Sequence, residues 1–256
     1  MSISLSKKVN YDSKGKTRGS TDFYQLSRSS LDGNLIIHRS GQQIGEYTQL
    51  GRDFSSNIRL RDFIFAEDTF LVVDSEANQV WKYNVNGAKK GKFKLNFKDG
   101  LNSPEGIALD SDGNIYIADW GNHRVVVFDD TGGFKYSFGK FGKNDNNNQN
   151  KGVKARFVFP TRITVEEDVI GVTETVDNIP IEVFKEKHIL VADRYGVHKF
   201  DSQGHYLHSP VRAGGDFPEG SFYAIAINGY GVDSNLYVAK RRDGEIIKFS
   251  GKAVKK

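Results

Sequence analysis

Short runs of β-branched and aromatic residues recur along the chain, and each of them ends in a polar residue. Runs of this kind, bounded by turn-forming residues, are typical of short buried strands. Their last positions lie mostly 35 to 47 residues apart, with one wider step of 74. The runs occupy residues 34–39, 69–74, 114–119, 188–193 and 235–240.

Each run is the centre of a larger unit. A turn and a second strand pattern follow most of the runs, a Gly-containing turn comes next, and in two units a further strand pattern follows that turn. Another strand pattern precedes the run, as in residues 105–110. Four short antiparallel strands in about 45 residues, repeated without a convincing helical period, predict an all-β fold, a β-propeller of four-stranded antiparallel blades.

The wide step leaves the number of blades open. It contains a polar run at residues 143–150 and two further strand patterns at residues 169–174 and 179–184. These two patterns are either a degenerate blade or a long hairpin inserted in one blade. We expect six blades, with five or seven as the alternatives.

One unit carries a specific family resemblance. Residues 103–129 read SPEGIALDSDGNIYIADWGNHRVVVFD and closely resemble an NHL repeat, including its Asn122-His123-Arg124 core. The resemblance implies an NHL-type propeller, most often six-bladed, over residues 21–256, in a family whose members usually serve as interaction platforms. Residues 1–20 match nothing in the family, and we expect a basic N-terminal arm or a strand that closes the ring.

The amino-acid composition excludes several classes of functional site. The chain has no cysteine, which excludes disulfide scaffolds, thiolate nucleophiles and cysteine-based metal sites. Its net charge of +4 lies in the two ends, because residues 1–20 and 252–256 contribute +4 and +3 and the remainder carries −3. A uniformly basic face for nucleic acid is therefore not indicated. With no long apolar run and no recognisable signal peptide, we expect a soluble, cytoplasmic, monomeric propeller without membrane contact.

Carboxylates end several of the equivalent strands. Asp74, Asp119 and Asp193 could ring one end of a central channel and bind a divalent cation, and we expect no cofactor apart from such an ion. The alternative is that each carboxylate caps its own turn by accepting backbone N–H bonds. The six histidines occupy different slots of the repeat and no Gly-x-Ser-x-Gly elbow is present, so histidine metal sites and nucleophilic catalysis have no support.

A lysine-rich segment spans residues 82–98, with six lysines and no acid. Its lysines alternate with apolar residues, which is the period of an outer strand with one solvated face. The functional alternative is contact with single-stranded RNA, because lysines neutralise phosphates and aromatic rings stack on bases. This segment is similar to the basic face on which some NHL propellers bind single-stranded RNA. The candidate contacts are Lys89, Lys90, Lys92 and Lys94.

Large aromatic and cationic residues lie directly after the recurrent strands. In a propeller such turns converge around the channel mouth, where they contact partners; the alternative is that these side chains pack between blades. The candidates are Trp120, His123, Arg194, Tyr195, Lys240 and Arg241.

These observations favour a non-catalytic scaffold that binds a protein or another macromolecule through its loop face. Two alternatives stay open. One is a propeller that binds single-stranded RNA, and the other is a divalent-metal-dependent hydrolase or lyase with its site in the central channel.

Overall fold

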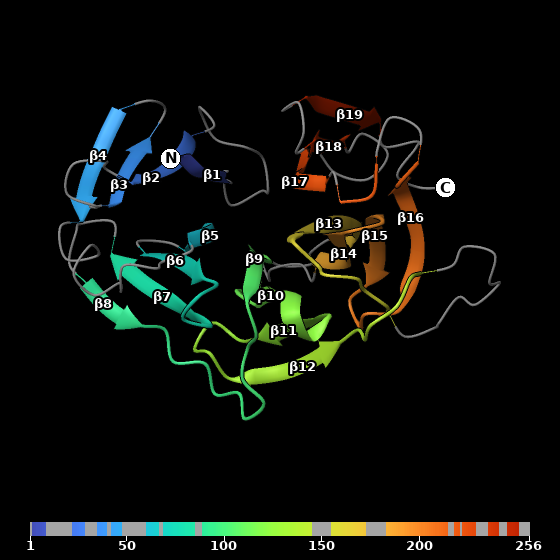
Figure 1. Ribbon diagram of the computed structural model, residues 1–256, viewed down its shortest axis with the longest axis horizontal. Coiled ribbons are helices and arrows are strands. Elements are labelled where there is room, and N and C mark those ends of the chain that lie inside the picture. Colours follow the sequence, from blue (N-terminus) through green and yellow to red (C-terminus); the bar gives the residue numbers. More distant parts are fainter. Residues whose placement is uncertain are drawn as a thin grey trace, which may run out of the picture. The chain divides into compact units, whose positions relative to one another are not determined.

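The chain folds into antiparallel β-sheets (Figure 1). The computed structural model describes residues 2–8, 22–28, 35–39, 42–47, 60–66, 69–84, 89–144, 155–172, 183–214, 218–220, 222–228, 235–240 and 245–250. These residues form five sheets, four with four strands and one with three. In every sheet the strand order follows the chain order, so each strand pairs with the next one as an antiparallel hairpin.

The chain divides into two compact units, and the first comprises Met1–Glu105 and Thr131–Gly133. It contains two four-stranded sheets. The first sheet consists of β1 (Ser2–Lys8), β2 (Asp22–Arg28), β3 (Leu35–Arg39) and β4 (Gln42–Tyr47). The second consists of β5 (Leu60–Ala66), β6 (Thr69–Asp74), β7 (Gln79–Asn84) and β8 (Lys89–Lys92).

The second unit comprises Gly106–Asp130 and Phe134–Lys256. A sheet that begins at the boundary consists of β9 (Pro104–Leu109), β10 (Ile115–Asp119), β11 (Arg124–Phe128) and β12 (Phe134–Phe138), with the 3-10 turn η1 (Trp120–Asn122) between β10 and β11. The next sheet consists of β13 (Arg162–Val172), β14 (Val183–Asp193), β15 (Gly196–Asp201) and β16 (Tyr206–Arg212). The last consists of β17 (Phe222–Asn228), β18 (Asn235–Lys240) and β19 (Ile246–Ser250). No helix in the described ranges is long and apolar enough to cross a membrane.

All five runs predicted from the hydrophobic pattern are strands. Four of them are the second strand of their sheet, whereas β3 is the third strand because β1 precedes its unit. β1 comes from the N-terminal segment that we expected to be an arm or a ring-closing strand, and it pairs along its length with β2. The domain boundary at residue 21 stays a prediction.

One long hairpin explains the wide step in the repeat. β13 and β14 are 11 residues long each, and their pairing continues to Val172 opposite Val183. The patterns at residues 169–174 and 179–184 therefore extend this hairpin, and the described part of them forms no separate blade. Because the described chain contains five sheets, the expected count of six blades is not confirmed.

The core of the second unit lies between neighbouring sheets. Phe138 of β12, Phe157 of the β12–β13 connection and Phe200 of β15 meet with ring centroids 5.1 to 6.1 Å apart. Phe157 and Phe200 are fully buried. Burial of one such side chain contributes about 1.5–3 kcal/mol, so this aromatic cluster holds the sheets β9–β12 and β13–β16 together. A second core, mostly aliphatic, joins β13–β16 to β17–β19 through Leu190, Ala192, Val197, Val211, Phe222, Leu236 and Val238.

Gly106, in the Pro-Glu-Gly sequence of the NHL-like motif, lies where β9 approaches the start of β13. A Cβ at this position would lie 2.7 Å from the carbonyl oxygen of Thr161 and 3.0 Å from the Cα of Arg162. Both neighbouring atoms are backbone atoms and cannot move aside easily. Glycine is therefore required by the close approach of two backbones.

Phe157→Ala is expected to lower the free energy of unfolding by about 3–5 kcal/mol, because it removes a fully buried ring and leaves a cavity. Chemical denaturation followed by tryptophan fluorescence measures this change. Phe141→Ala is the matched control, since Phe141 lies in the same connection but is 66% exposed. The control should change the free energy of unfolding by less than about 0.5 kcal/mol. Equal losses in the two variants would contradict this description of the core.

Candidate functional site

In each of two sheets, a turn residue with positive φ accepts a hydrogen bond from the connection that leads to the next sheet. In the second unit, His123 has φ 53°, and its Nδ1 accepts a hydrogen bond of 3.1 Å from the backbone N–H of Phe159. In the first unit, Asn78 has φ 55°, and its Oδ1 accepts a hydrogen bond from the backbone N–H of Ser103. Phe159 and Ser103 both have positive φ and both precede a proline. The histidine of the NHL-like motif therefore has a structural role that asparagine fulfils in the preceding repeat.

The same contact gathers an aromatic cluster at this end of the second unit. The rings of Trp120 and Phe159 stack with centroids 4.2 Å apart. His123 lies 4.6 Å from the Phe159 ring and 4.9 Å from the Phe141 ring. Phe141 is the most exposed member, with two thirds of its surface accessible. A rigidly supported and exposed aromatic ring is typical of a contact surface.

A second group of side chains lies at the turn after β14. The Lys143 ammonium lies 3.6 Å from the centre of the Tyr195 ring and 3.8 Å from the Glu219 carboxylate. The Arg194 guanidinium lies 3.4 Å from the same carboxylate. The backbone N–H of Arg194 donates to the carbonyl of Val158, so this turn adjoins the connection that carries Phe159. These ion pairs are about half exposed and stabilise the fold little, which leaves their charges accessible.

The connections that follow β10, β12, β14 and β16 lie at one end of their sheets, because antiparallel strands reverse direction at every turn. We call their described residues in the second unit the loop edge. Asp119 and Asp193 are buried there, and Glu219 is the single exposed acid among the described residues of these connections. Five cations on the described residues of these connections and of the end of β16 are exposed, so these residues carry more exposed positive than negative charge. The five cations are Lys140, Lys143, Arg156, Arg194 and Arg212.

Four of the six predicted contact residues lie on the loop edge, namely Trp120, His123, Arg194 and Tyr195. Lys240 ends β18, and its ammonium lies 2.7 Å from the Glu245 carboxylate. Arg241 lies outside the described residues. That these residues bind a partner stays a prediction.

Sequence reasoning missed Phe141, Lys143 and Phe159. Phe159 and Pro160 resemble the opening of the repeat, but Phe141 and Lys143 lie in a stretch without a repeat signature, where the lysines and phenylalanine of residues 140–143 were the local signal. Their importance depends on contacts with His123 and Tyr195, which are distant in sequence.

The predicted RNA contacts lie at β8 in the first unit. Lys89, Lys90 and Lys92 belong to this strand, and their side chains lie outside the described residues. Lys94 follows the strand and is exposed. Exposure alternates through residues 93–98, with the apolar positions partly buried, as expected for a segment with one solvated face. Contact of these lysines with RNA stays a prediction.

The three candidate metal ligands are buried, and each is hydrogen-bonded at its own turn. Asp74 accepts two backbone N–H bonds of 3.1 Å within the turn that it begins. Asp119 lies 2.7 Å from the Arg124 guanidinium, and Asp193 accepts a bond of 2.7 Å from the backbone N–H of Tyr195. No group of three or more His, Asp or Glu residues in the described parts of the chain is arranged to hold a metal ion.

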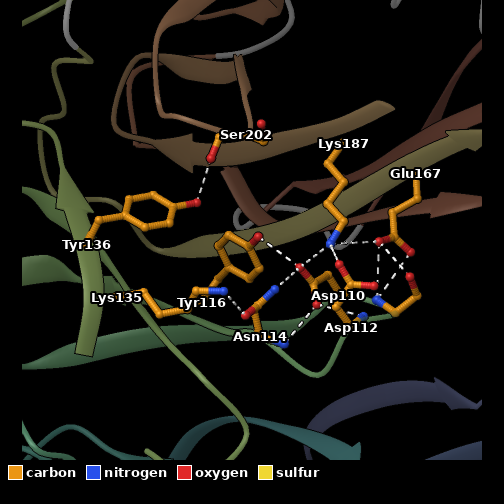
Figure 2. A network of polar contacts seen from close by, with 10 residues as sticks. Asp110, Asp112, Asn114, Tyr116, Lys135, Tyr136, Glu167, Lys187 and Ser202 are labelled. Carbon is orange, nitrogen blue, oxygen red and sulfur yellow. Dashed lines mark hydrogen bonds and ion pairs between the residues drawn. The ribbon is translucent and has the colours of Figure 1, made fainter. Parts of the chain in front are cut away.

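The opposite end of the second unit carries a network of ion pairs (Figure 2). The Lys187 ammonium lies 2.8 Å from Asp110 and 3.5 Å from Glu167, and it also pairs with Asp112. Burial alone would raise the pKa of Asp110, but hydrogen bonds from Asn114 and Lys187 outweigh burial and lower it. Burial alone would lower the pKa of Lys187, but its hydrogen bonds to the two aspartates raise it. The charges therefore satisfy one another, and the network fastens the β9–β10 turn to β13 and β14.

Comparisons with known proteins agree with the repeat pattern. Residues 101–128 match the family model of the NHL repeat. Protein brain tumor from Drosophila melanogaster is 30% identical over 108 residues, which cover 41% of this chain and 9% of that protein. The chain therefore carries an NHL repeat at these residues. The matched part spans about a tenth of the length of that relative.

Solved structures support a β-propeller fold for this chain. A protein of unknown function from Bacteroides thetaiotaomicron is 18% identical, with a TM-score of 0.56 over 90% of this chain and 56% of that one. A gluconolactonase from Xanthomonas campestris is 14% identical, with a TM-score of 0.50 over 90% of this chain and 67% of that one. At these identities the likeness concerns the fold alone.

His123→Asn is expected to reduce the loss of stability in acid. Burial lowers the pKa of His123, so its contribution to stability is complete above about pH 7 and falls as the pH drops below about 6.5, where the unfolded chain takes up protons first. Asparagine keeps the acceptor, as Asn78 shows, but does not titrate. Urea unfolding between pH 7.5 and 5 measures the difference, and the other histidines contribute equally to both proteins. Identical pH profiles would refute this role of His123.

Millimolar Ca²⁺, Mg²⁺ or Mn²⁺ is expected to leave the thermal unfolding midpoint unchanged, because Asp74, Asp119 and Asp193 already accept internal hydrogen bonds. A thermal-shift series with and without chelator checks this expectation. A rise with one metal that persists at moderate salt and disappears in Asp119→Asn would instead support a carboxylate metal site.

Proposed function

We propose that this protein is a binding scaffold that contacts a macromolecular partner through the loop edge of its second unit. The observation that supports the proposal is the exposed Phe141 ring, which contacts His123 on an edge whose described residues include five exposed cations and a single exposed acid. An apolar ring supplies an anchor, and arginines and tyrosines such as Arg194 and Tyr195 are enriched among residues that dominate binding energies.

The anchor is held in place before a partner arrives. The backbone N–H of Gly142 donates to the carbonyl of Phe157, and the N–H of Phe157 donates to the carbonyl of Lys140. The Asn144 side chain bonds both the N–H and the carbonyl of Arg156. Because this connection is fastened on both sides and Phe157 is a core residue, little conformational entropy is lost when Phe141 binds.

The charge of the loop edge indicates an anionic partner. Among the described residues of this edge the five exposed cations outnumber the exposed acids, since Asp119 and Asp193 are buried and Glu219 alone pairs with Lys143 and Arg194. Complementary charge speeds association and selects against basic partners.

Single-stranded RNA is the second candidate, and the interleaving of rings and cations favours it. Phe141 lies in sequence between Lys140 and Lys143, and Lys143 lies over the Tyr195 ring. Proteins that bind single strands stack bases on such rings and pair phosphates with such cations. This candidate would use the loop edge rather than the lysines around β8.

The decisive experiment measures binding of two labelled probes, a random single-stranded RNA pool and a polyglutamate peptide, by fluorescence anisotropy at low and moderate salt. Phe141→Ala and Arg194→Glu are each expected to weaken binding about tenfold or more, because they remove the anchor and reverse a charge. Lys135→Glu is the matched control, since Lys135 is exposed but bonds Asn114 at the opposite end of the sheet. It should leave the affinity within about twofold.

The two probes separate the candidates. Binding of RNA with a salt slope that falls by about 0.7 in Arg194→Ala supports a phosphate contact at that residue. Binding of the acidic peptide in preference to RNA supports a protein partner. Failure of both probes, or unchanged affinity in folded Phe141→Ala and Arg194→Glu, would overturn the proposal.

A further inference from the structure

Asp193, His198 and Ser209 form one chain of hydrogen bonds across three neighbouring strands. Asp193 ends β14, His198 lies in β15 and Ser209 lies in β16. The distance from Asp193 Oδ1 to His198 Nε2 is 2.9 Å, and the distance from His198 Nδ1 to Ser209 Oγ is 2.6 Å. The Tyr206 hydroxyl lies 2.8 Å from the same Ser209 oxygen.

The hydrogen bonds of Asp193 determine which imidazole nitrogen carries the proton. The carboxylate accepts backbone N–H bonds of 2.7 Å from Tyr195 and 2.9 Å from Val158. An ionised carboxylate can only accept hydrogen bonds, so Nε2 of neutral His198 must donate to it. Nδ1 is then left as an acceptor that faces the Ser209 hydroxyl. This is the arrangement of an orienting carboxylate, a general base and a nucleophile.

The carboxylate and the imidazole are more buried than the serine, as expected for a site whose nucleophile must meet a substrate. The side chains of Asp193 and His198 are 1% and 4% exposed, whereas Ser209 is partly accessible on the last strand of its sheet. The carboxylate and the base are therefore shielded from water, while the Ser209 residue keeps some contact with solvent. Shielding strengthens the electrostatic coupling between the buried groups.

We propose that Ser209 is a nucleophile for acyl transfer, with His198 as its general base, and that the site hydrolyses small activated carboxylic esters. Ser209 Oγ bonds to the ester carbonyl carbon, and its proton passes to His198 Nδ1. The bond to the alcohol oxygen breaks, and the alcohol leaves with that proton. Water then attacks the acyl-serine through the same base, which releases the carboxylic acid and restores Ser209. The Tyr206 hydroxyl is placed to donate to negative charge that develops beside Ser209 Oγ.

Asp193 is a positioning residue in this reaction, because it acts through His198. Asp193→Asn keeps the shape of the side chain but presents an amide to the imidazole, which no longer fixes the reactive tautomer. The variant is expected to lose both the low-field NMR resonance of the His198 Nε2 proton and the reactivity of Ser209. A purely structural role for Asp193 would leave the reactivity of the folded protein unchanged.

The test exposes the full chain to an alkyl fluorophosphonate and maps the modified residue by peptide mass spectrometry. Ser209 Oγ displaces fluoride from phosphorus, and the proton passes to His198. We expect Ser209 to be modified at least about 100-fold faster than Ser137, an exposed serine on the last strand of the sheet β9–β12 that serves as the internal control. The preference should disappear in urea-unfolded protein, and Ser209→Ala should abolish the burst of p-nitrophenol from p-nitrophenyl acetate.

His198→Gln is expected to slow the labelling of Ser209 by about 100-fold or more, provided that its unfolding midpoint shows a folded protein. The labelling rates of Ser209 and Ser137 in the unsubstituted protein test the proposal even if this variant does not fold. Labelling of Ser209 no faster than of Ser137, or labelling that is unaffected in a folded His198→Gln protein, would overturn the proposal without bearing on binding at the loop edge.

Discussion

Each sheet of this protein presents two faces and covers neither by itself, so the fold depends on how one sheet meets the next. Between β9–β12 and β13–β16 the contact is made by a ring from each sheet and by Phe157, which belongs to the connection between them. The same connection exposes Phe141 and brings Phe159 to His123. One segment therefore joins the hydrophobic core to the candidate contact surface, and the stability of the sheet contact holds the surface in shape.

The two ends of the second unit use charge in opposite ways. Around Lys187 the acids and the ammonium lie within ion-pair distance and satisfy one another, which contributes to holding two sheets together. At the loop edge the acids Asp119 and Asp193 are buried at turns, so among the described residues Glu219 is the single exposed acid beside five exposed cations. Burial of acids thus both caps turns and leaves a positive surface that is available to a partner.

Equivalent positions of a repeat serve different chemistry. Asp74, Asp119 and Asp193 end equivalent strands and all three are buried, but their partners differ. Asp74 holds backbone amides of its turn, Asp119 pairs with Arg124, and Asp193 orients His198. The repeat therefore provides a position for a buried carboxylate, and the neighbouring strands decide what that carboxylate does.

The hydrophobic pattern by itself determined the strands and their antiparallel succession, because these depend on alternation within a few residues and on turn signals next to them. The NHL-type unit was readable from the family resemblance of residues 103–129. The capping alternative was also readable for Asp74 and Asp193, since each binds an amide of its own turn, whereas Asp119 pairs with the Arg124 side chain. Only the tertiary structure decided that Trp120, Phe141 and Tyr195 share one edge, that residues 169–172 lengthen a hairpin, and that His198 faces Ser209. Those outcomes depend on which distant segments pack together and on strand register, and a shift of one residue would turn each side chain to the other face.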